Sequence, residues 1–429
     1  MDKERRSVIS WALYDWANSA FATTVMAGFF PAFFKKFWSA GTAASESTFY
    51  LGLANSIASI LVAALAPFLG AIADRGTAKR KFLFTFAFLG IVMTGGLWMV
   101  ERGHWPMAVL LYVLASIGFA GGNIFYDSLL PSVSPKNRVD YVSSLGFSLG
   151  YVGGGLLLLL NVLMYNFPDS FGIPDETTAI RLAFLSVAVW WAVFSIPTFL
   201  WVKEPRIYNP VKIKEAAVLG WQQLINTLKE IRYLKIVGLF LLAYWLYIDG
   251  VDTIIKMAVD YGVSLGFADS SLIAALLIVQ FIAFPATMVY YKMAKKIGVK
   301  SAIIIGIIGY CLITFLGYFM NSTWHFYGLA ALVGLFQGGI QALSRSLYSR
   351  IIPREKAAEF YGFYNMLGKF AAVLGPTMMG TVTLITKNVR NGILSVFLLF
   401  IAGGYFLWKV DLKEGERIAN EYLRKDNGF

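Results

Sequence analysis

The chain has few of the residues that reactive or metal-binding chemistry needs. Its 429 residues include a single cysteine, Cys311, and two histidines, His104 and His325. A lone cysteine excludes an intramolecular disulfide, and so few Cys and His side chains exclude a zinc cage built from them. We also find no glycine-rich phosphate loop and no histidine placed for acid–base work. The sequence therefore predicts no metal, no cofactor and no enzymatic activity.

Charged residues are also scarce. They make up 14% of the chain, whereas hydrophobic residues make up 58%, and soluble domains hold about 25% charged residues. The apolar residues form runs of about 20, the length that crosses a bilayer as a helix. Although the net charge is +12, Lys and Arg lie in the short connections between these runs rather than on one face of a folded domain. We expect an integral membrane protein that binds no nucleic acid.

Breaks between the apolar runs predict an all-α membrane fold with twelve spanning helices. The first six are expected at residues 8–37, 48–73, 81–101, 105–133, 139–165 and 179–202. The other six are expected at residues 235–261, 269–293, 299–320, 324–350, 357–386 and 391–411. The predicted domains are a six-helix bundle (1–202), a linker with an amphipathic helix (203–234), a second six-helix bundle (235–411) and a tail (412–429).

Lys and Arg are distributed unequally between the two sides of this topology. The side with both termini and the linker carries most of them. The opposite side has only Lys35, Lys36, Arg102, Arg181, Lys387 and Arg390. Because basic loops stay in the cytoplasm, we expect both termini to be cytoplasmic, in a bacterial inner membrane. The protein is expected to be a monomer that contacts membrane lipids.

The two predicted bundles resemble each other in sequence. Segment 121–129 of the fourth helix has a Gly-Gly pair and then Asp127-Ser-Leu; segment 338–347 of the tenth has a Gly-Gly pair and then Arg345-Ser-Leu. Duplicated six-helix halves joined by a loop are typical of transporters, which rock the two halves about a site near the membrane midplane. The repeat therefore favours a transporter of small molecules.

The turn after the second helix carries a motif of a known superfamily. Residues 70–81 read Gly-Ala-Ile-Ala-Asp-Arg-Gly-Thr-Ala-Lys-Arg-Lys. This resembles the Gly-x-x-x-Asp-Arg-x-Gly-x-Arg-Arg loop of the major facilitator superfamily, with the spacing changed by one residue after Arg75. The equivalent loop of the second half, residues 295–300, keeps the basic residues and the glycine but has lost the acid.

The first helix narrows the resemblance. Residues 11–21 read Trp-Ala-Leu-Tyr-Asp-Trp-Ala-Asn-Ser-Ala-Phe, which resembles the signature of the vacuole effluxer family, related to the autophagy-linked vacuolar amino-acid exporter. Segments 125–131 and 247–250 strengthen the match. The resemblance implies export of a solute, with amino acids as the eukaryotic precedent. It also implies that the first, fourth, seventh and tenth helices line a central cavity.

Ionisable side chains inside the predicted helices are candidate functional residues. Each costs about 2.5–3.5 kcal/mol at the centre of a spanning helix, so each needs a partner or a water-filled cavity. By the boundaries above they are Asp15, Asp127, Asp249, Asp252, Lys256, Asp260, Arg345 and Lys369. They gather on the first, fourth, seventh, tenth and eleventh helices.

Three of these charges share one face of the seventh helix, because Asp249, Asp252 and Lys256 are spaced i, i+3 and i+7. In one interpretation they form a substrate or proton site, where a desolvated carboxylate exchanges a proton as its exposure alternates. In the other, Lys256 neutralises Asp252 as an internal pair that positions the helix. The sequence leaves both interpretations open.

Polar residues of the first helix form a second candidate site. Tyr14, Asp15 and Asn18 lie within about one turn of each other and are candidates to contact a cationic or amine group of a substrate. The alternative is a hydrogen-bond cluster that ties the first helix to its neighbours.

Other polar residues offer complementary groups to such a substrate. Lys369, with Arg345, is a candidate to bind a carboxylate, so that a zwitterion would find both signs in one cavity; alternatively, Lys369 pairs with an acid or extends to the membrane surface. Four neutral residues are candidates for further hydrogen bonds to substrate or between helices: Gln280, Gln337, Gln341 and Asn365.

Four charged residues are assigned to conformational switching. Asp127 and Arg345 are expected to pair across the halves when the inner gate is shut. The superfamily resemblance also implies a charge relay between Asp127 and the loop with Asp74 and Arg75. Asp74 is further expected to approach the N-terminus of the eleventh helix, where the helix dipole favours an anion.

These patterns together predict a secondary active transporter that exports a small organic solute by alternating access, driven by protons. Three alternatives are weaker: facilitated diffusion, transport of an amphipathic lysolipid or drug, and a receptor or scaffold that moves no solute. The intramembrane charges argue against a scaffold, which has no need to carry their insertion cost.

Overall fold

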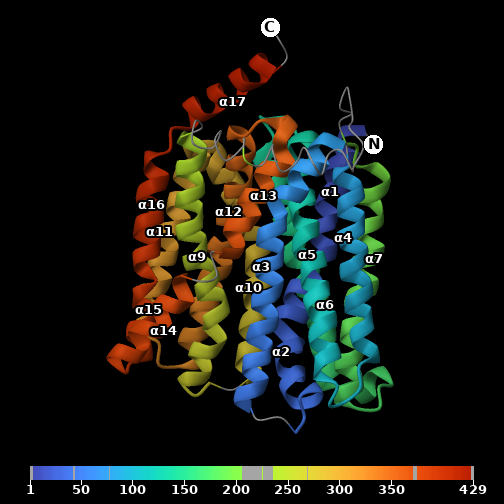
Figure 1. The fold of residues 1–429 in the computed structure, drawn as a ribbon. Coiled ribbons are helices and arrows are strands. Elements are labelled where there is room, and N and C mark those ends of the chain that lie inside the picture. Colours follow the sequence, from blue (N-terminus) through green and yellow to red (C-terminus); the bar gives the residue numbers. More distant parts are fainter. Residues whose placement is uncertain are drawn as a thin grey trace.

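The computed structural model describes residues 3–41, 44–76, 78–204, 225, 235–267, 269–370 and 374–426. These residues form a bundle of long helices (Figure 1). The N- and C-terminal ends of the chain lie at the same end of the bundle, together with the turns that precede α4 and α13 (Figure 1). We call this the basic end, because Lys79, Arg80, Lys81, Arg354 and Lys356 belong to it. Residues 3–204 are called the first half and residues 235–426 the second half.

In the first half, the predicted spans appear as helices with small changes at their ends. The first is α1 (Lys3–Ala20), which continues through a π-helical segment (Phe21–Phe29), α2 (Phe30–Phe33) and a second π-helical segment (Phe34–Trp38). It is followed by α3 (Ala44–Gly76), α4 (Lys79–Gly96), α5 (Trp105–Val133), α6 (Val139–Asn166) and α7 (Glu176–Trp201). Asp175 caps α7, because its Oδ1 accepts a hydrogen bond from the N–H of Thr178 at 2.8 Å.

In the second half, one predicted span is divided by a turn. The helices are α9 (Lys235–Ser264), α10 (Asp269–Ile297), α11 (Val299–Tyr318), α12 (Thr323–Ile351), α13 (Ala357–Phe370), α14 (Leu374–Thr386), α15 (Val389–Ser395), α16 (Phe397–Lys409) and α17 (Leu412–Asp426). The span expected over 357–386 contains α13 and α14, and residues 371–373 between them lie outside the described ranges. The span expected over 391–411 is divided at Val396 into α15 and α16.

Some expectations about the spans go untested. Nine helices in the described ranges are long and apolar enough to cross a membrane. The first and eleventh predicted spans are not among them, and of the second only the shorter apolar helix Ser59–Asp74 is counted. The number twelve and the four predicted domains therefore stay predictions. The amphipathic helix expected within 203–234 falls almost wholly outside the described residues.

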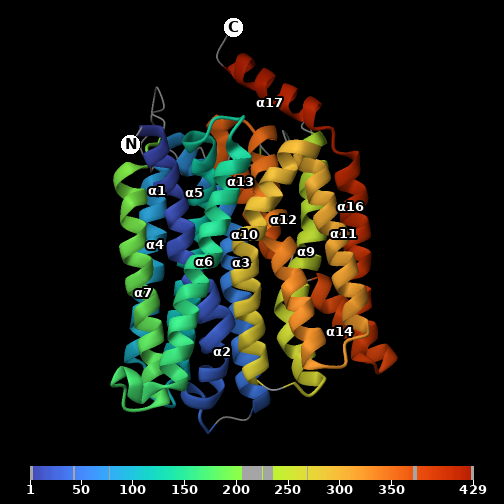
Figure 2. The same cartoon turned by 180° about the vertical axis from the view of Figure 1, so that it is seen from behind.

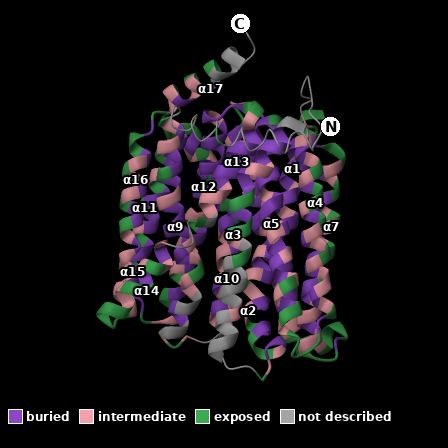
Figure 3. Ribbon diagram, viewed as in Figure 1, coloured by how far each residue is buried: buried purple, intermediate pink, exposed green. Residues whose placement is uncertain are grey.

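The surface of the bundle suits hydrocarbon. Buried residues lie where helices face one another, and exposed residues cover the outside (Figure 3). The outer faces carry large apolar side chains: Phe88 is 57% exposed, Val189 55% and Ile308 61%. Exposed apolar surface on this scale marks contact with a membrane or a partner, in agreement with the apolar composition.

The two halves meet along two seams. At one, α3 packs against α13 near the basic end. There a Cβ on Gly70 would overlap the backbone carbonyl of Ala358, so only a residue without a side chain permits this approach. At the other seam, α6 packs against α10 (Figure 2), and Ser148 Oγ donates to the carbonyl of Phe284 at 2.9 Å.

Candidate functional site

A cavity of about 470 Å³ lies between the two halves. Polar side chains gather in its part nearer the basic end: Asp15, Asn18, Asn123, Asp127, Gln337, Gln341, Arg345 and Asn365. Its lining also includes Met320, Phe326 and Ile393, which lie at the ends of helices away from the basic end. The cavity thus has a polar floor toward the basic end and reaches the opposite end between apolar walls. Its volume is in the range of small-molecule sites.

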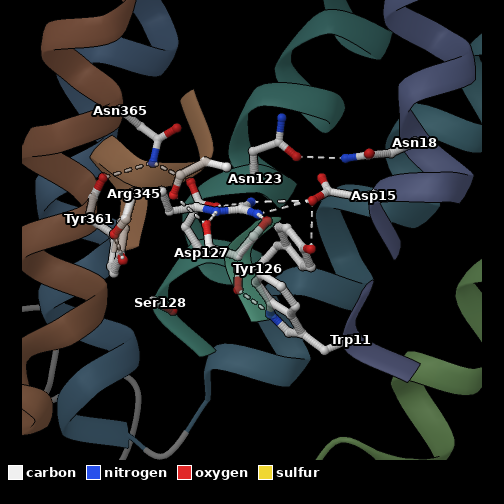
Figure 4. A network of polar contacts seen from close by, with 12 residues as sticks. Trp11, Asp15, Asn18, Asn123, Tyr126, Asp127, Ser128, Arg345, Tyr361 and Asn365 are labelled. Atoms are coloured by element: carbon white, nitrogen blue, oxygen red, sulfur yellow. Dashed lines mark hydrogen bonds and ion pairs between the residues drawn. The ribbon is translucent and has the colours of Figure 1, made fainter. Parts of the chain in front are cut away.

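The floor is built around Arg345 of α12, whose side chain is 3% exposed. Nη1 lies 3.0 Å from Asp127 Oδ1, and Nη2 lies 3.2 Å from Asp15 Oδ2 (Figure 4). Nε donates to Ser143 Oγ at 2.9 Å, and Nη2 donates to the Ser143 carbonyl at the same distance. Every nitrogen of the guanidinium therefore has an acceptor, and all of these acceptors come from the first half. Asp127 and Arg345 thus pair across the halves as predicted, and the gating role assigned to this pair stays a prediction.

Further residues fix the two carboxylates. Tyr126 donates its hydroxyl to Asp15 Oδ2 at 2.8 Å, and Asn365 donates its amide to Asp127 Oδ2 at 3.2 Å (Figure 4). Trp11 stacks on the Tyr126 ring with centroids 4.3 Å apart and donates its indole N–H to the Tyr126 carbonyl. We call Arg345, Asp15, Asp127, Ser143 and Tyr126 the charge cluster.

The close contact of α6 with the charge cluster depends on Gly146. A Cβ at this position would lie 2.6 Å from Asp15 Oδ2 and 3.0 Å from Arg345 Nη2. At the next position, the Arg345 guanidinium lies 4.2 Å from the centroid of the Phe147 ring, a cation–π contact that favours the buried cation. In α6, Gly146 therefore leaves room for the charge cluster, and Phe147 provides an aromatic face for its cation.

Asp74 makes a second contact between the halves. Its carboxylate accepts hydrogen bonds from the backbone N–H groups of Ala358 at 3.1 Å and Glu359 at 2.8 Å, and Lys79 Nζ lies 2.7 Å from Oδ1. These N–H groups begin α13 and lack partners within their own helix. The predicted approach of Asp74 to the eleventh helix is confirmed. The side chain of Arg75 lies outside the described residues.

The predicted relay between Asp127 and the loop with Asp74 is not seen among the described contacts. Asp127 bonds to Arg345 and Asn365, both in the second half, whereas Asp74 bonds to Lys79 and α13. The two acids therefore act in separate contacts between the halves. A third contact lies nearby, where Arg350 Nη2 is 2.5 Å from Asp140 Oδ2.

The three charges on α9 have different surroundings although they share a helical face. Asp249 is fully buried and accepts hydrogen bonds from the N–H groups of Leu374 at 3.1 Å and Gly375 at 2.9 Å, at the start of α14. It does not line the cavity, whereas Asp252 does. Lys256 Nζ lies 3.9 Å from Asp252 Oδ2 and its side chain is 54% exposed. Asp249 therefore contacts the described start of α14, and Asp252 is the acid of this group that lines the cavity.

The other predicted site residues are divided between cavity and core. Asn18 lines the cavity and donates to Asn123 Oδ1 at 2.6 Å (Figure 4). Tyr14 is fully buried beside the Tyr126 ring and is not part of the cavity lining.

The two predicted glutamines and the predicted lysine also differ. Gln341 accepts from the Tyr151 hydroxyl at 2.7 Å. Buried Gln337 Oε1, in the same lining, has no hydrogen-bond partner among the described residues. The side chains of Lys369 and Asp260 lie outside the described residues.

Sequence reasoning missed several neutral residues of the site. Ser143, Asn123 and Tyr126 all bond to predicted residues, but an uncharged polar residue costs less than an ionised one in a membrane helix and so gives a weaker signal by composition. The signal that was available is the repeated glycines of α6, which indicate a helix packed closely against functional side chains.

Comparisons with known proteins agree with this geometry. Residues 41–420 match the family described as "Vacuole effluxer Atg22 like". The chain is 38% identical over 396 residues to an uncharacterized MFS-type transporter, YxiO, of Bacillus subtilis (strain 168), and the match covers 92% of each chain. It is 25% identical to autophagy-related protein 22 of Yarrowia lipolytica, covering 82% of this chain and 73% of that one.

Among solved structures, the human organic anion transporter MFSD10 (TETRAN) superposes with a TM-score of 0.73. The match covers 95% of this chain and all of the other at 13% identity, so it shows a shared fold. The expected superfamily fold is thereby confirmed. The chain belongs to the Atg22-like vacuole effluxer family, a family of membrane transporters with the major facilitator superfamily fold.

Proposed function

We propose that this protein is a secondary active transporter that exports a small, amino-acid-like solute from the bacterial cytoplasm by alternating access. The observation that supports this proposal most is that the charge cluster closes one end of the cavity between the halves. The cavity lies between the halves, and Arg345 of the second half closes its floor against Asp15 and Asp127 of the first. In our proposal the basic end is cytoplasmic, and the structure represents the state that faces outward.

The floor of the cavity is also the inner gate in this proposal. The contacts that hold the halves together there include three that involve charged side chains: the charge cluster, Asp74 with α13, and Arg350 with Asp140. All three must separate before a solute can enter from the basic end. Since Asp15, Asp127 and Arg345 line the cavity as well, a bound solute or proton can change the stability of the closed gate directly. This is the differential interaction that coupling requires.

The charge balance of the cluster supports proton coupling. One guanidinium faces two carboxylates, Asp15 and Asp127. With both carboxylates ionised, the cluster has one uncompensated negative charge in a poorly solvated place. A proton or the ammonium group of a solute would neutralise it, so we propose that the two compete for the cluster. This proposal moves the proton site from Asp249, which holds α14, to the cavity floor.

The lining suits a solute with one charged end and an apolar side chain. Gln337 lines the cavity, and we propose its amide as a hydrogen-bonding group for the ammonium end of the solute. Asp252 lies on the cavity wall. Ile254, Met257 and Phe326 offer apolar contacts. The same apolar walls favour the runner-up, an amphipathic lysolipid or drug. Lys369 stays our candidate to bind a carboxylate.

Transport from a mixed pool tests the proposal. Proteoliposomes would be loaded with the common amino acids and a lysolipid, and efflux would be followed by mass spectrometry with and without an imposed pH gradient. We expect efflux of one or a few amino acids that the gradient accelerates. Efflux of the lysolipid alone would favour the runner-up, and no efflux at any pH would refute transport.

Two substitutions test the charge balance. Asp15→Asn and Asp127→Asn each leave one carboxylate beside Arg345, so the cluster becomes neutral without a proton. We expect each variant to exchange solute across the membrane at equal pH, but to lose acceleration by the gradient. A pH gradient that still drives both variants would contradict the proposed proton site.

A further inference from the structure

A second recess lies on the outer surface at the basic end. It is an open groove of about 1000 Å³, and α4 contributes Arg80, Lys81 and Phe84 to it. The other wall consists of Phe199, near the end of α7, and of Lys203 and Glu204, which follow α7. We propose that this groove binds the phosphate headgroup of an anionic phospholipid, with the acyl chains lying along α4 and α7.

The charges of the groove favour an anion. Its lining has three cations, Arg80, Lys81 and Lys203, and one acid, Glu204. Glu204 is already engaged, because its two carboxylate oxygens accept the backbone N–H groups of Lys79 at 2.8 Å and Arg80 at 3.2 Å. The lining therefore keeps an excess of two positive charges. Basic pockets between membrane helices on the cytoplasmic side are suited to anionic headgroups.

One cation of the groove is held in place by the protein. Arg80 donates Nη2 to the backbone carbonyl of Phe199, which connects α4 to α7 across the groove. Its buried Nε has no hydrogen-bond partner among the described residues. Thr85 supplies a hydroxyl in the same lining. The groove thus combines a fixed guanidinium, a donor without a partner, and two exposed lysines.

The depth of the groove matches the headgroup region. Trp201, at the end of α7, is 38% exposed, and the Arg6 guanidinium lies 3.9 Å from the centroid of its ring. Trp and Arg side chains at the end of a spanning helix mark the membrane interface. Lys203 follows two residues later. The cations of the groove therefore lie where lipid phosphates lie.

An apolar surface continues from the groove along both helices. On α4, Phe84 is 54% exposed and Phe88 57%; on α7, Ile196 is 52% exposed and Leu200 63%. A soluble phosphate would use the cations alone, whereas a phospholipid would also cover these side chains. This is why we assign the groove to a lipid. Lys79 adjoins it and bonds to Asp74 of the gate, so a bound lipid would contact the helix start that the gate uses.

Lipid binding to the purified full-length protein tests the inference without any transport measurement. The probe is dioleoylphosphatidylglycerol, with dioleoylphosphatidylcholine and glycerol 3-phosphate as comparison ligands, and retained lipid is counted by native mass spectrometry. The groove variant is Lys81→Gln with Lys203→Gln. The matched control is Lys295→Gln with Lys296→Gln, which removes two exposed lysines from α10 at the same end.

We expect the wild type and the control to retain phosphatidylglycerol, and the groove variant to bind it about 30-fold more weakly, the effect of two cations near a membrane surface. Lys81→Arg with Lys203→Arg should retain binding. Equal binding by the groove variant and the control would overturn the inference. So would equal binding of phosphatidylcholine, or retention of glycerol 3-phosphate as strong as that of phosphatidylglycerol.

Discussion

Arg345 of α12 and Asp127 of α5 are 218 positions apart in the chain, yet Nη1 of the first lies 3.0 Å from Oδ1 of the second. Both side chains are buried, with 3% and 10% of their surfaces exposed. Removing one partner of a buried ion pair is destabilising, because the remaining charge stays buried without compensation for its desolvation. The contact therefore joins the halves in this state, and both charges must find other partners or water when the floor opens.

Arg345→Met should destabilise the closed state by about 3–5 kcal/mol, because it leaves the carboxylates of Asp15 and Asp127 without their cation. We expect a lower melting temperature in detergent and no solute exchange in proteoliposomes. Arg354→Met is the control, since Arg354 is exposed at the same end of the bundle. If both variants had the melting temperature of the wild type, the charge cluster would not hold the halves together.

Asp249→Ala should lower stability by about 1 kcal/mol through loss of a helix cap, without changing the pH dependence of transport. The reason is that Asp249 accepts the first N–H groups of α14 rather than facing the cavity. Asp175→Ala, which removes the cap of α7, is the matched control. A changed pH profile in Asp249→Asn would return Asp249 to the proton pathway.

Asp252→Asn should alter solute affinity, because Asp252 lines the cavity.

Gly70→Val should prevent closure of the basic end, because a side chain there would overlap the carbonyl of Ala358 in α13. The substitution affects only the state in which α3 and α13 touch, so we expect the opposite state to accumulate. The measurement is labelling of a cavity cysteine from the basic side, which should increase. Gly380→Val is the control, because a Cβ at Gly380 has no atom within 4 Å. Equal labelling of the two variants would contradict the importance of this seam.

The sequence was most informative about charge. An ionisable residue in a membrane helix is costly, and this identified Asp15, Asp127 and Arg345 before any contact was known. The approach of Asp74 to the start of the eleventh helix was also predictable, from the charge of the acid and the dipole of a helix start. Helix positions followed from hydropathy, because the bilayer sets the length of each apolar run.

Neighbours across the bundle were beyond sequence reasoning. Spacing placed Asp249 and Asp252 on one face of a helix, but it did not show that this face divides between α14 and the cavity. Ser143 is neutral and belongs to no motif, so its two contacts with Arg345 could not be expected. The turn at Val396 that divides α15 from α16 was missed because the residues on both sides of it are mostly apolar and continue the helical pattern.

The most direct test of the account is the accessibility of the cavity from each side of the membrane. Cys311 is the only cysteine of the chain, so Cys311→Ser with Ala22→Cys places one thiol on the cavity wall, two turns from Asp15 in sequence. We predict that a membrane-impermeant maleimide labels this thiol from the outside in the otherwise native protein, and from the cytoplasmic side once Arg345→Met opens the floor. Labelling from neither side in both backgrounds would contradict alternating access.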